Sequence, residues 1–178
     1  MLFSLNTIAQ NKHVITPQDV LSIRELSDVK LAPDGKQIAF VVTEANDPRS
    51  PREPRVANIW IVPADGHEAP RPLSPGLKDA VSPRWSPDGR MLAFLSQGGG
   101  GEAPAEESTQ IYVLREGEKR AKALTHISGG VEEYQWSPDR QMIAFVARDQ
   151  ASAEELDRRS AGDDAIVQPE ANLKYLRL

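Results

Sequence analysis

A twelve-residue pattern that occurs three times constrains the fold of this chain more than any other feature. The copies are Leu31–Val42, Trp85–Ser96 and Trp136–Ala147, and each joins a Pro-Asp turn to a run rich in Ile, Leu, Val and Phe. The prolines of successive copies stand 54 and 51 residues apart. A fixed period of this length is typical of a repeat architecture, so the sequence predicts one structural unit used three times.

Each copy predicts a β-hairpin. Proline presets φ at the second position of a tight turn, aspartate forms local hydrogen bonds, and glycine accepts the positive φ that closes the loop. The apolar run that follows does not alternate with polar residues, which predicts a strand buried on both faces. Arg140 stands where the other copies have Gly35 and Gly89. A left-handed conformation costs a non-glycine residue roughly 1 kcal/mol, so Arg140→Gly is predicted to stabilise the protein slightly.

Each repeat also has a second half. Further strands are predicted at Asn58–Val62 and Gln110–Leu114, each followed by a turn and a short fourth segment. Four short strands in about 50 residues describe a β-propeller blade. The predicted fold class is therefore all-β, a partial β-propeller of about two and a half four-stranded blades with a short N-terminal helix. The predicted boundaries are 1–26 for the N-terminal arm and helix and 27–178 for the incomplete propeller, with blade one at about 27–74, blade two at about 80–126 and partial blade three at about 131–178, including an insertion at 148–172.

The residues before the first repeat carry a helix-start signal. Thr16 is suited to the N-cap position and Pro17 to the first helical position, while Asp19 would meet the free amide groups of the first turn. This helix is expected to run to about Glu25 or Leu26.

The predicted number of blades is too small for a closed propeller. Propellers close with four to eight blades, and closure protects their sheet edges. Two and a half blades cannot close. We therefore expect the chain to be part of a longer protein, or a truncated product whose apolar faces stay uncovered.

Composition excludes several functions. A net charge of −5 and a pI near 5.3 argue against binding to nucleic acid or to an anionic membrane. The absence of cysteine rules out disulfides and thiolate metal sites, and it fits a cytoplasmic location. No metal or cofactor site is predicted, because His13, His67 and His126 are interpreted as solvated loop residues. Trp85 and Trp136 share one repeat position, which favours core packing over ligand stacking.

Three features resemble the N-terminal portion of prolyl oligopeptidase-family serine peptidases, of the acylaminoacyl-peptidase or dipeptidyl-peptidase-like bacterial type. The first is the leader Thr16–Gly35, in which the expected helix runs directly into the first repeat. The second is the threefold hairpin. The third is Ala161–Val167, which is similar to a family insertion placed just before a strand.

The resemblance implies a seven- or eight-bladed propeller followed by an α/β-hydrolase domain. In this family the propeller restricts access so that peptides, rather than folded proteins, reach the nucleophile. The family's catalytic Ser, Asp and His lie in the hydrolase domain, and the chain contains no G-x-S-x-G motif, so no catalytic residue is assigned. The implied partners are that C-terminal hydrolase domain and peptide substrates, and self-association is left open.

Glu154 and Glu155 are the candidates for substrate binding. Some dipeptidyl peptidases of the family use paired propeller glutamates to hold the substrate's amino terminus, through charge-assisted hydrogen bonds. Here Arg158 and Arg159 follow at helical spacing, so a solvated helix with internal ion pairs is the other interpretation.

Two alternatives to a peptidase propeller stay open at this point. One is a non-enzymatic propeller that binds a protein partner, as in the Tol envelope system. The other is an inactive truncated product.

Overall fold

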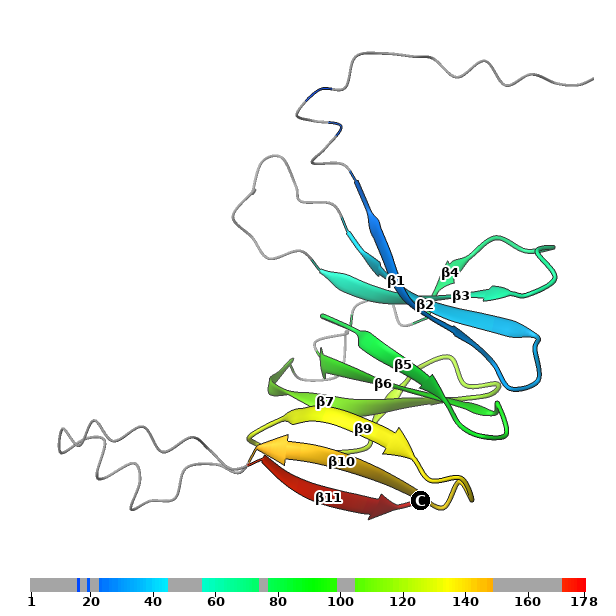
Figure 1. Ribbon diagram of the computed structural model, residues 1–178. Helices are drawn as coiled ribbons and strands as arrows, with labels where there is room; N and C mark the ends of the chain where they lie inside the picture. The colour runs from blue at the N-terminus through cyan, green and yellow to red at the C-terminus, as the bar shows by residue number, and fades with distance from the viewer. Residues whose placement is uncertain are drawn as a thin grey trace, which may run out of the picture.

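The computed structural model describes residues 23–44, 56–73, 77–98, 105–148 and 171–178, together with Thr16 and Asp19. These residues form three antiparallel sheets that lie side by side in chain order (Figure 1). The first sheet has the order β1-β2-β3-β4, the second β5-β6-β7-β8, and the third β11-β10-β9. Their bounds are β1 Glu25–Leu31, β2 Gln37–Thr43, β3 Ala57–Pro63, β4 Arg71–Pro72, β5 Val81–Trp85, β6 Met91–Gly98, β7 Ala105–Arg115, β8 Lys122–Ala123, β9 Val131–Trp136, β10 Met142–Arg148 and β11 Ala171–Arg177.

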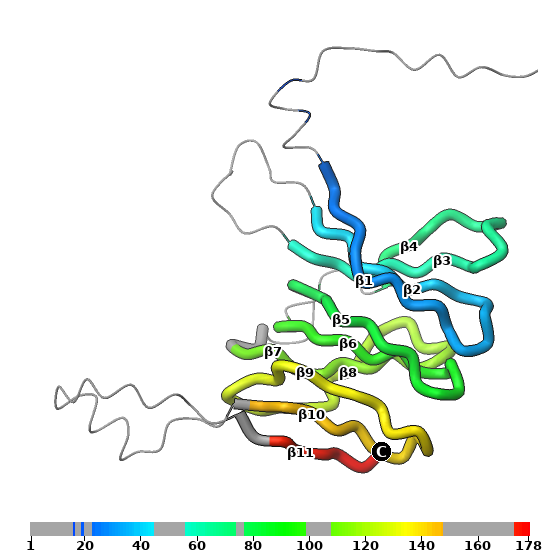
Figure 2. The backbone as a smooth tube through the Cα atoms, in the orientation of Figure 1, coloured from blue at the N-terminus to red at the C-terminus, as the bar shows by residue number. Residues whose placement is uncertain are grey.

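Each sheet is a chain of neighbouring strands without crossovers, which is the construction of a propeller blade. The tube in Figure 2 shows the same meander repeated from one sheet to the next. The predicted all-β fold class, a partial β-propeller, is confirmed.

The three hairpins close as the sequence predicts. The amide groups of Gly35, Gly89 and Arg140 donate to the carbonyls three residues earlier at 2.9, 2.8 and 3.0 Å. All three residues have positive φ, at 72°, 72° and 65°. Arg140 therefore adopts the left-handed conformation predicted for the position at which it replaces glycine.

The strand after the second hairpin, β6, separates two hydrophobic cores. In β6, Leu92 and Phe94 belong to the core between the first and second sheets, whereas Ala93 and Leu95 belong to the core between the second and third. All four side chains are buried. A strand between two sheets has no solvent-facing side, which explains why its apolar run does not alternate.

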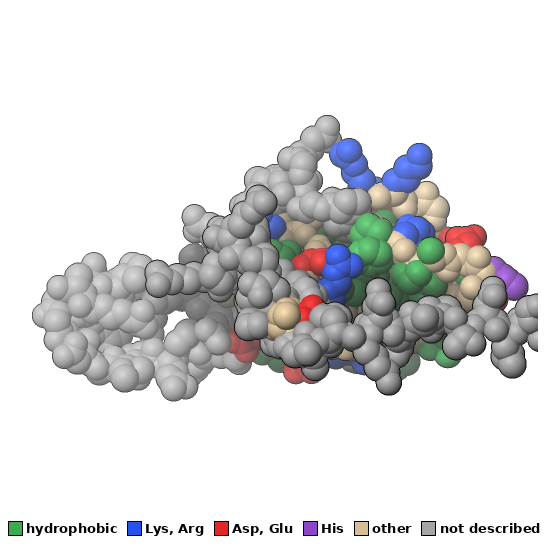
Figure 3. Space-filling model, turned by 90° about the horizontal axis from the view of Figure 1, so that it is seen from above, with side chains coloured by type: hydrophobic (Ala, Val, Ile, Leu, Met, Phe, Trp, Pro, Cys, Tyr) green, Lys and Arg blue, Asp and Glu red, His purple; other side chains and the backbone are tan. Residues whose placement is uncertain are grey.

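The outer faces of the stack are exposed and apolar. Leu173 and Tyr175 of β11 are 76% and 77% exposed, whereas Ile111 and Val113, at the equivalent register positions of β7, are 0% and 6% exposed. Leu31 of β1 is likewise exposed. Figure 3 looks onto the side of the first sheet that faces away from the second, and hydrophobic side chains gather there among Lys and Arg.

The end expected for the N-terminal helix is wrong. The expected helix does not extend to Glu25 or Leu26, because β1 begins at Glu25 and Leu26 pairs with Val42 of β2. Pairing with a neighbouring strand outweighs the local helical pattern there. The start signal itself is present, since the Thr16 amide donates to Asp19 Oδ2 at 2.7 Å and the Asp19 amide donates to Thr16 Oγ1 at 3.3 Å. Most of the residues between Asp19 and β1 lie outside the described part.

Candidate functional site

The innermost strands of successive sheets are joined through aromatic side chains. Trp136 donates its indole N–H to the carbonyl of Arg84 at 3.0 Å, and Trp85 donates to the carbonyl of Lys30 at 3.1 Å. The Tyr134 hydroxyl donates to the carbonyl of Ser82 at 2.7 Å. Burial raises the pKa of Tyr134 well above its usual range, so the phenol stays neutral. These contacts hold one blade against the next.

The tryptophans thus pack between sheets, as their repeat position predicts. Trp136 is buried at 6% exposure in the core between the second and third sheets. Trp85 is half-buried, and it also lines a groove between the first and second sheets. The sequence predicted the packing of Trp85 but not the groove that it lines.

The second and third hairpin turns are connected by an ion pair. Arg140 Nη1 lies 2.8 Å from Asp88 Oδ2. Asp88 also accepts the Ser86 hydroxyl at 2.6 Å and the Arg90 amide at 3.2 Å. The Ser86 hydroxyl and, to a smaller extent, Arg140 lower the pKa of Asp88 to about 2. The carboxylate of Asp88 is therefore ionised at neutral pH and fixes the turn.

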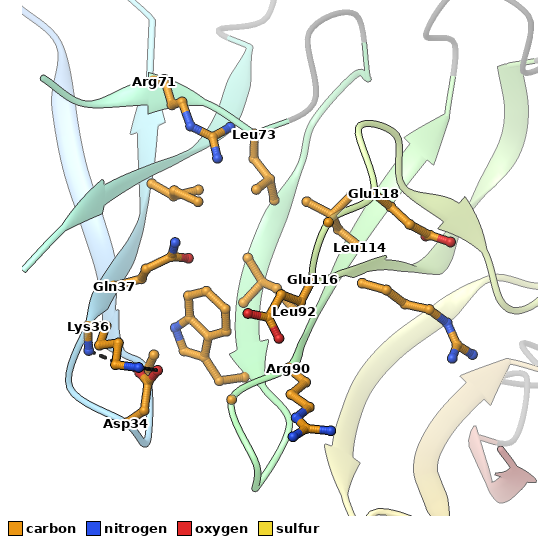
Figure 4. Close-up of a pocket in the computed structure, with 16 residues that line it drawn as sticks. Asp34, Lys36, Gln37, Arg71, Leu73, Arg90, Leu92, Leu114, Glu116 and Glu118 are labelled. Carbon is orange, nitrogen blue, oxygen red and sulfur yellow. Dashed lines mark hydrogen bonds and ion pairs between the residues drawn. The ribbon is translucent and has the colours of Figure 1, made fainter. Parts of the chain in front are cut away.

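The groove lies at the hairpin-turn end of the first two sheets and encloses about 190 Å³. Its apolar wall consists of side chains from both sheets, namely Ile61, Leu73, Trp85, Leu92 and Leu114. Its polar side chains come from turns and strand ends, and Figure 4 shows Gln37, Arg71, Arg90 and Glu116 around the opening. The repeat pattern did not point to this groove, because its polar residues differ between the repeats: Glu116 is equivalent to Ala64 of the first blade.

The predicted site residues are only partly described. Glu154 and Glu155 lie outside the described residues, as does His13. His67 and His126 are exposed, in agreement with their interpretation as solvated loop residues. In the described part of the chain, no group of His, Asp and Glu side chains is arranged to hold a metal ion. Nor does any helix there have the length and apolarity to cross a membrane.

Comparison with known sequences identifies peptidases. No protein-family model matches the chain. Over 158 residues it is 32% identical to the uncharacterized peptidase YuxL of Bacillus subtilis, a match that covers 89% of this chain and 22% of the relative. Over 134 residues it is 28% identical to dipeptidyl-peptidase 5 of Porphyromonas endodontalis, covering 75% of this chain and 18% of the relative. The chain thus spans about a fifth of the length of these curated relatives.

Comparison with solved structures agrees on the fold. The AtxE2 isopeptidase matches 92% of this chain and 30% of its own length, with a TM-score of 0.64 and 19% identity. The β-propeller domain of the trilobed protease from Pyrococcus furiosus matches 70% of this chain and 35% of its own length, with a TM-score of 0.51 and 22% identity. TolB from Acinetobacter baumannii also matches 70% of this chain and 27% of its own length, at 0.50 and 24%.

The class defined by these observations is an open segment of a β-propeller. The curated relatives narrow the class, because they are peptidases and the match to them covers most of this chain. The chain is a β-propeller segment that is related in sequence to these peptidases and matches about a fifth of their length.

Proposed function

We propose that this chain is the scaffold and substrate gate of a serine peptidase that hydrolyses short peptides or acyl-peptides. The nucleophile would lie in an α/β-hydrolase domain elsewhere in the parent protein. The observation that carries the proposal is the 32% identity to a peptidase over 158 residues. The small share of the relative that is matched leaves ample length for a catalytic domain.

The strand topology indicates which end of the sheets would face the substrate. The connections that leave β2 at Thr43, β6 at Gly98 and β10 at Arg148 include the two longest within blades, residues 44–56 and 149–170. Successive strands are antiparallel, so these three strand ends lie at one end of the sheets and the tight hairpins at the other (Figure 1). Loops on a rigid scaffold are the usual place for substrate recognition. We assign the substrate-facing side to the end with the long connections.

Glu154 and Glu155 belong to the longest of these connections. On this proposal they would reach the substrate-facing side, where carboxylates could hold the amino terminus of a peptide. We further propose a cytoplasmic location, because the chain contains no cysteine. Self-association can be measured on the purified full-length protein.

The proposal is tested on the full-length protein. A fluorophosphonate probe should label one serine, and the protein should hydrolyse dipeptidyl or N-acetylaminoacyl coumarin amides. Residues 1–178 alone should do neither. A full-length protein that takes no label and cleaves no substrate would contradict the proposal and favour a protein-binding propeller of the Tol type, or an inactive product.

A further inference from the structure

The groove between the first two blades contains more unpaired positive than negative charge. Arg71, Arg90 and Arg115 line it, and none of them forms an ion pair within the described residues. The one lining carboxylate that is also unpaired in the described part is Glu116. The chain as a whole has a net charge of −5, so this excess of positive charge is local to the groove.

The other charges of the groove are already neutralised. Lys36 Nζ lies 3.8 Å from Asp34 Oδ2, and Glu118 Oε1 lies 2.9 Å from Lys122 Nζ. Arg71 and Arg90 therefore have no neighbouring acid to pair with in the described part, whereas Arg115 helps to lower the pKa of Glu118. Guanidinium groups that face water beside an apolar wall are suited to a carboxylate, because they can donate two parallel hydrogen bonds.

The wall of the groove is apolar and held in place. Leu73 and Leu92 are buried at 4% and 2% exposure, and the Trp85 ring is tied to the first blade through its bond to the Lys30 carbonyl. A half-buried indole beside two leucines offers a fixed surface to an aliphatic or aromatic side chain. The Gln37 amide, which points toward the same space in Figure 4, has no hydrogen-bond partner for its side chain within the described residues. It can bond to a peptide backbone.

We propose that this groove binds a short acidic peptide segment. An apolar side chain of the segment packs against Trp85, Leu73 and Leu92. Its carboxylates bind Arg71 and Arg90, and its backbone bonds to Gln37. Complementarity of charge selects the ligand, since two of the unpaired positive charges are not matched by Glu116.

The test is isothermal titration calorimetry on the full-length protein after treatment with a fluorophosphonate, so that the peptide is not consumed. The probe is acetyl-Gly-Asp-Phe-Leu-Glu-Gly-amide, and its neutral counterpart has Asn and Gln in place of Asp and Glu. The acidic probe should bind about tenfold or more tightly than the neutral one. Its affinity should fall as the salt concentration rises.

Substitutions in the groove test which side chains bind the acidic probe. Arg71→Gln and Arg90→Gln should each weaken binding of the acidic probe about fivefold to tenfold, whereas Glu116→Gln should strengthen it. Lys119→Gln, an exposed charge change that does not line the groove, is the matched control and should leave affinity unchanged. Thermal unfolding of each variant checks the fold, and Arg71→Lys should bind with intermediate affinity because it keeps charge but loses the planar fork.

Three outcomes would overturn the proposal. They are no binding of the acidic probe at millimolar concentration, equal binding of the acidic and neutral probes, and equal effects of the groove variants and Lys119→Gln. Binding is measured as heat, so the result does not depend on whether the protein is a peptidase.

Discussion

Trp136 donates its indole N–H to the backbone carbonyl of Arg84, and Trp85 makes the equivalent bond to Lys30 one blade earlier. Each bond runs from the last residue of an inner strand to the residue before the equivalent position in the preceding blade. The repeat thus uses one side chain to fill the space between blades and to satisfy a carbonyl there. Leu31, the equivalent residue of the first blade, is 60% exposed.

Trp136→Phe should lower the free energy of unfolding by about 1–2 kcal/mol. Phenylalanine keeps most of the packing but cannot donate, so the Arg84 carbonyl loses its partner. Thermal or urea unfolding of the propeller in the full-length protein measures the change. Leu31→Phe alters the equivalent position of the first blade, which forms no such bond, and should change stability by less than about 0.5 kcal/mol. Equal effects at the two positions would refute a role for the hydrogen bond.

Gln110→Leu should lower the free energy of unfolding further, by about 3 kcal/mol. Gln110 is 0% exposed, accepts from the Thr125 hydroxyl and the Ile127 amide at 2.9 Å each, and donates to the Ile127 carbonyl at 2.7 Å. Leucine has a similar volume but leaves these buried groups without partners. Gln141→Leu is the control, because Gln141 is exposed and its side chain forms no hydrogen bond in the described part of the chain. A destabilisation below 1 kcal/mol for Gln110→Leu would show that the network is not what holds this connection.

The hairpins and the blade order could be predicted because their signals are local and repeated. Pro, Asp and Gly fix each turn, and a continuous apolar run marks a strand between two sheets. The end of the leader helix was misjudged because the pairing of Leu26 with Val42 depends on a strand sixteen residues away. The groove could not be predicted at all. Arg71, Arg90 and Glu116 come from two blades and are brought together only by the stacking of sheets.

The ion pair between Arg140 and Asp88 modifies the prediction for Arg140→Gly. Glycine removes left-handed strain of roughly 1 kcal/mol but also removes a partly exposed ion pair, which contributes about 0.2–1 kcal/mol. We expect a small net stabilisation at low salt that increases at 1 M NaCl, where the pair is screened. Arg140→Ala loses the pair and keeps the strain, so it should be destabilising. If Arg140→Gly is clearly destabilising at both salt concentrations, the turn does not store strain.

Asp88 should make the free energy of unfolding depend on pH in the acidic range. Its folded-state pKa of about 2 lies below the ordinary 3.8, so its ionised form stabilises the folded state. This contribution is fully present above pH 4 and is lost as the pH falls from about 4 through 2. Solvent screening reduces it to the order of 1 kcal/mol. Asp88→Asn should be less stable than the wild type at pH 6 by this amount and should approach it near pH 2, as followed by unfolding at a series of pH values. A constant difference from pH 6 to pH 2 would contradict the assignment.

Replacing Glu154 and Glu155 by alanine distinguishes the two interpretations of that pair. If they bind the substrate's ammonium group, the double variant of the full-length enzyme should lose about tenfold or more in kcat/KM for dipeptidyl substrates with a free amine, because charge-assisted bonds are lost. N-acetylated substrates carry no ammonium group, so their kcat/KM should stay the same, which provides the internal control. Equal kcat/KM for free-amine substrates in the variant and the wild type would assign both glutamates to a solvated surface, paired with Arg158 and Arg159.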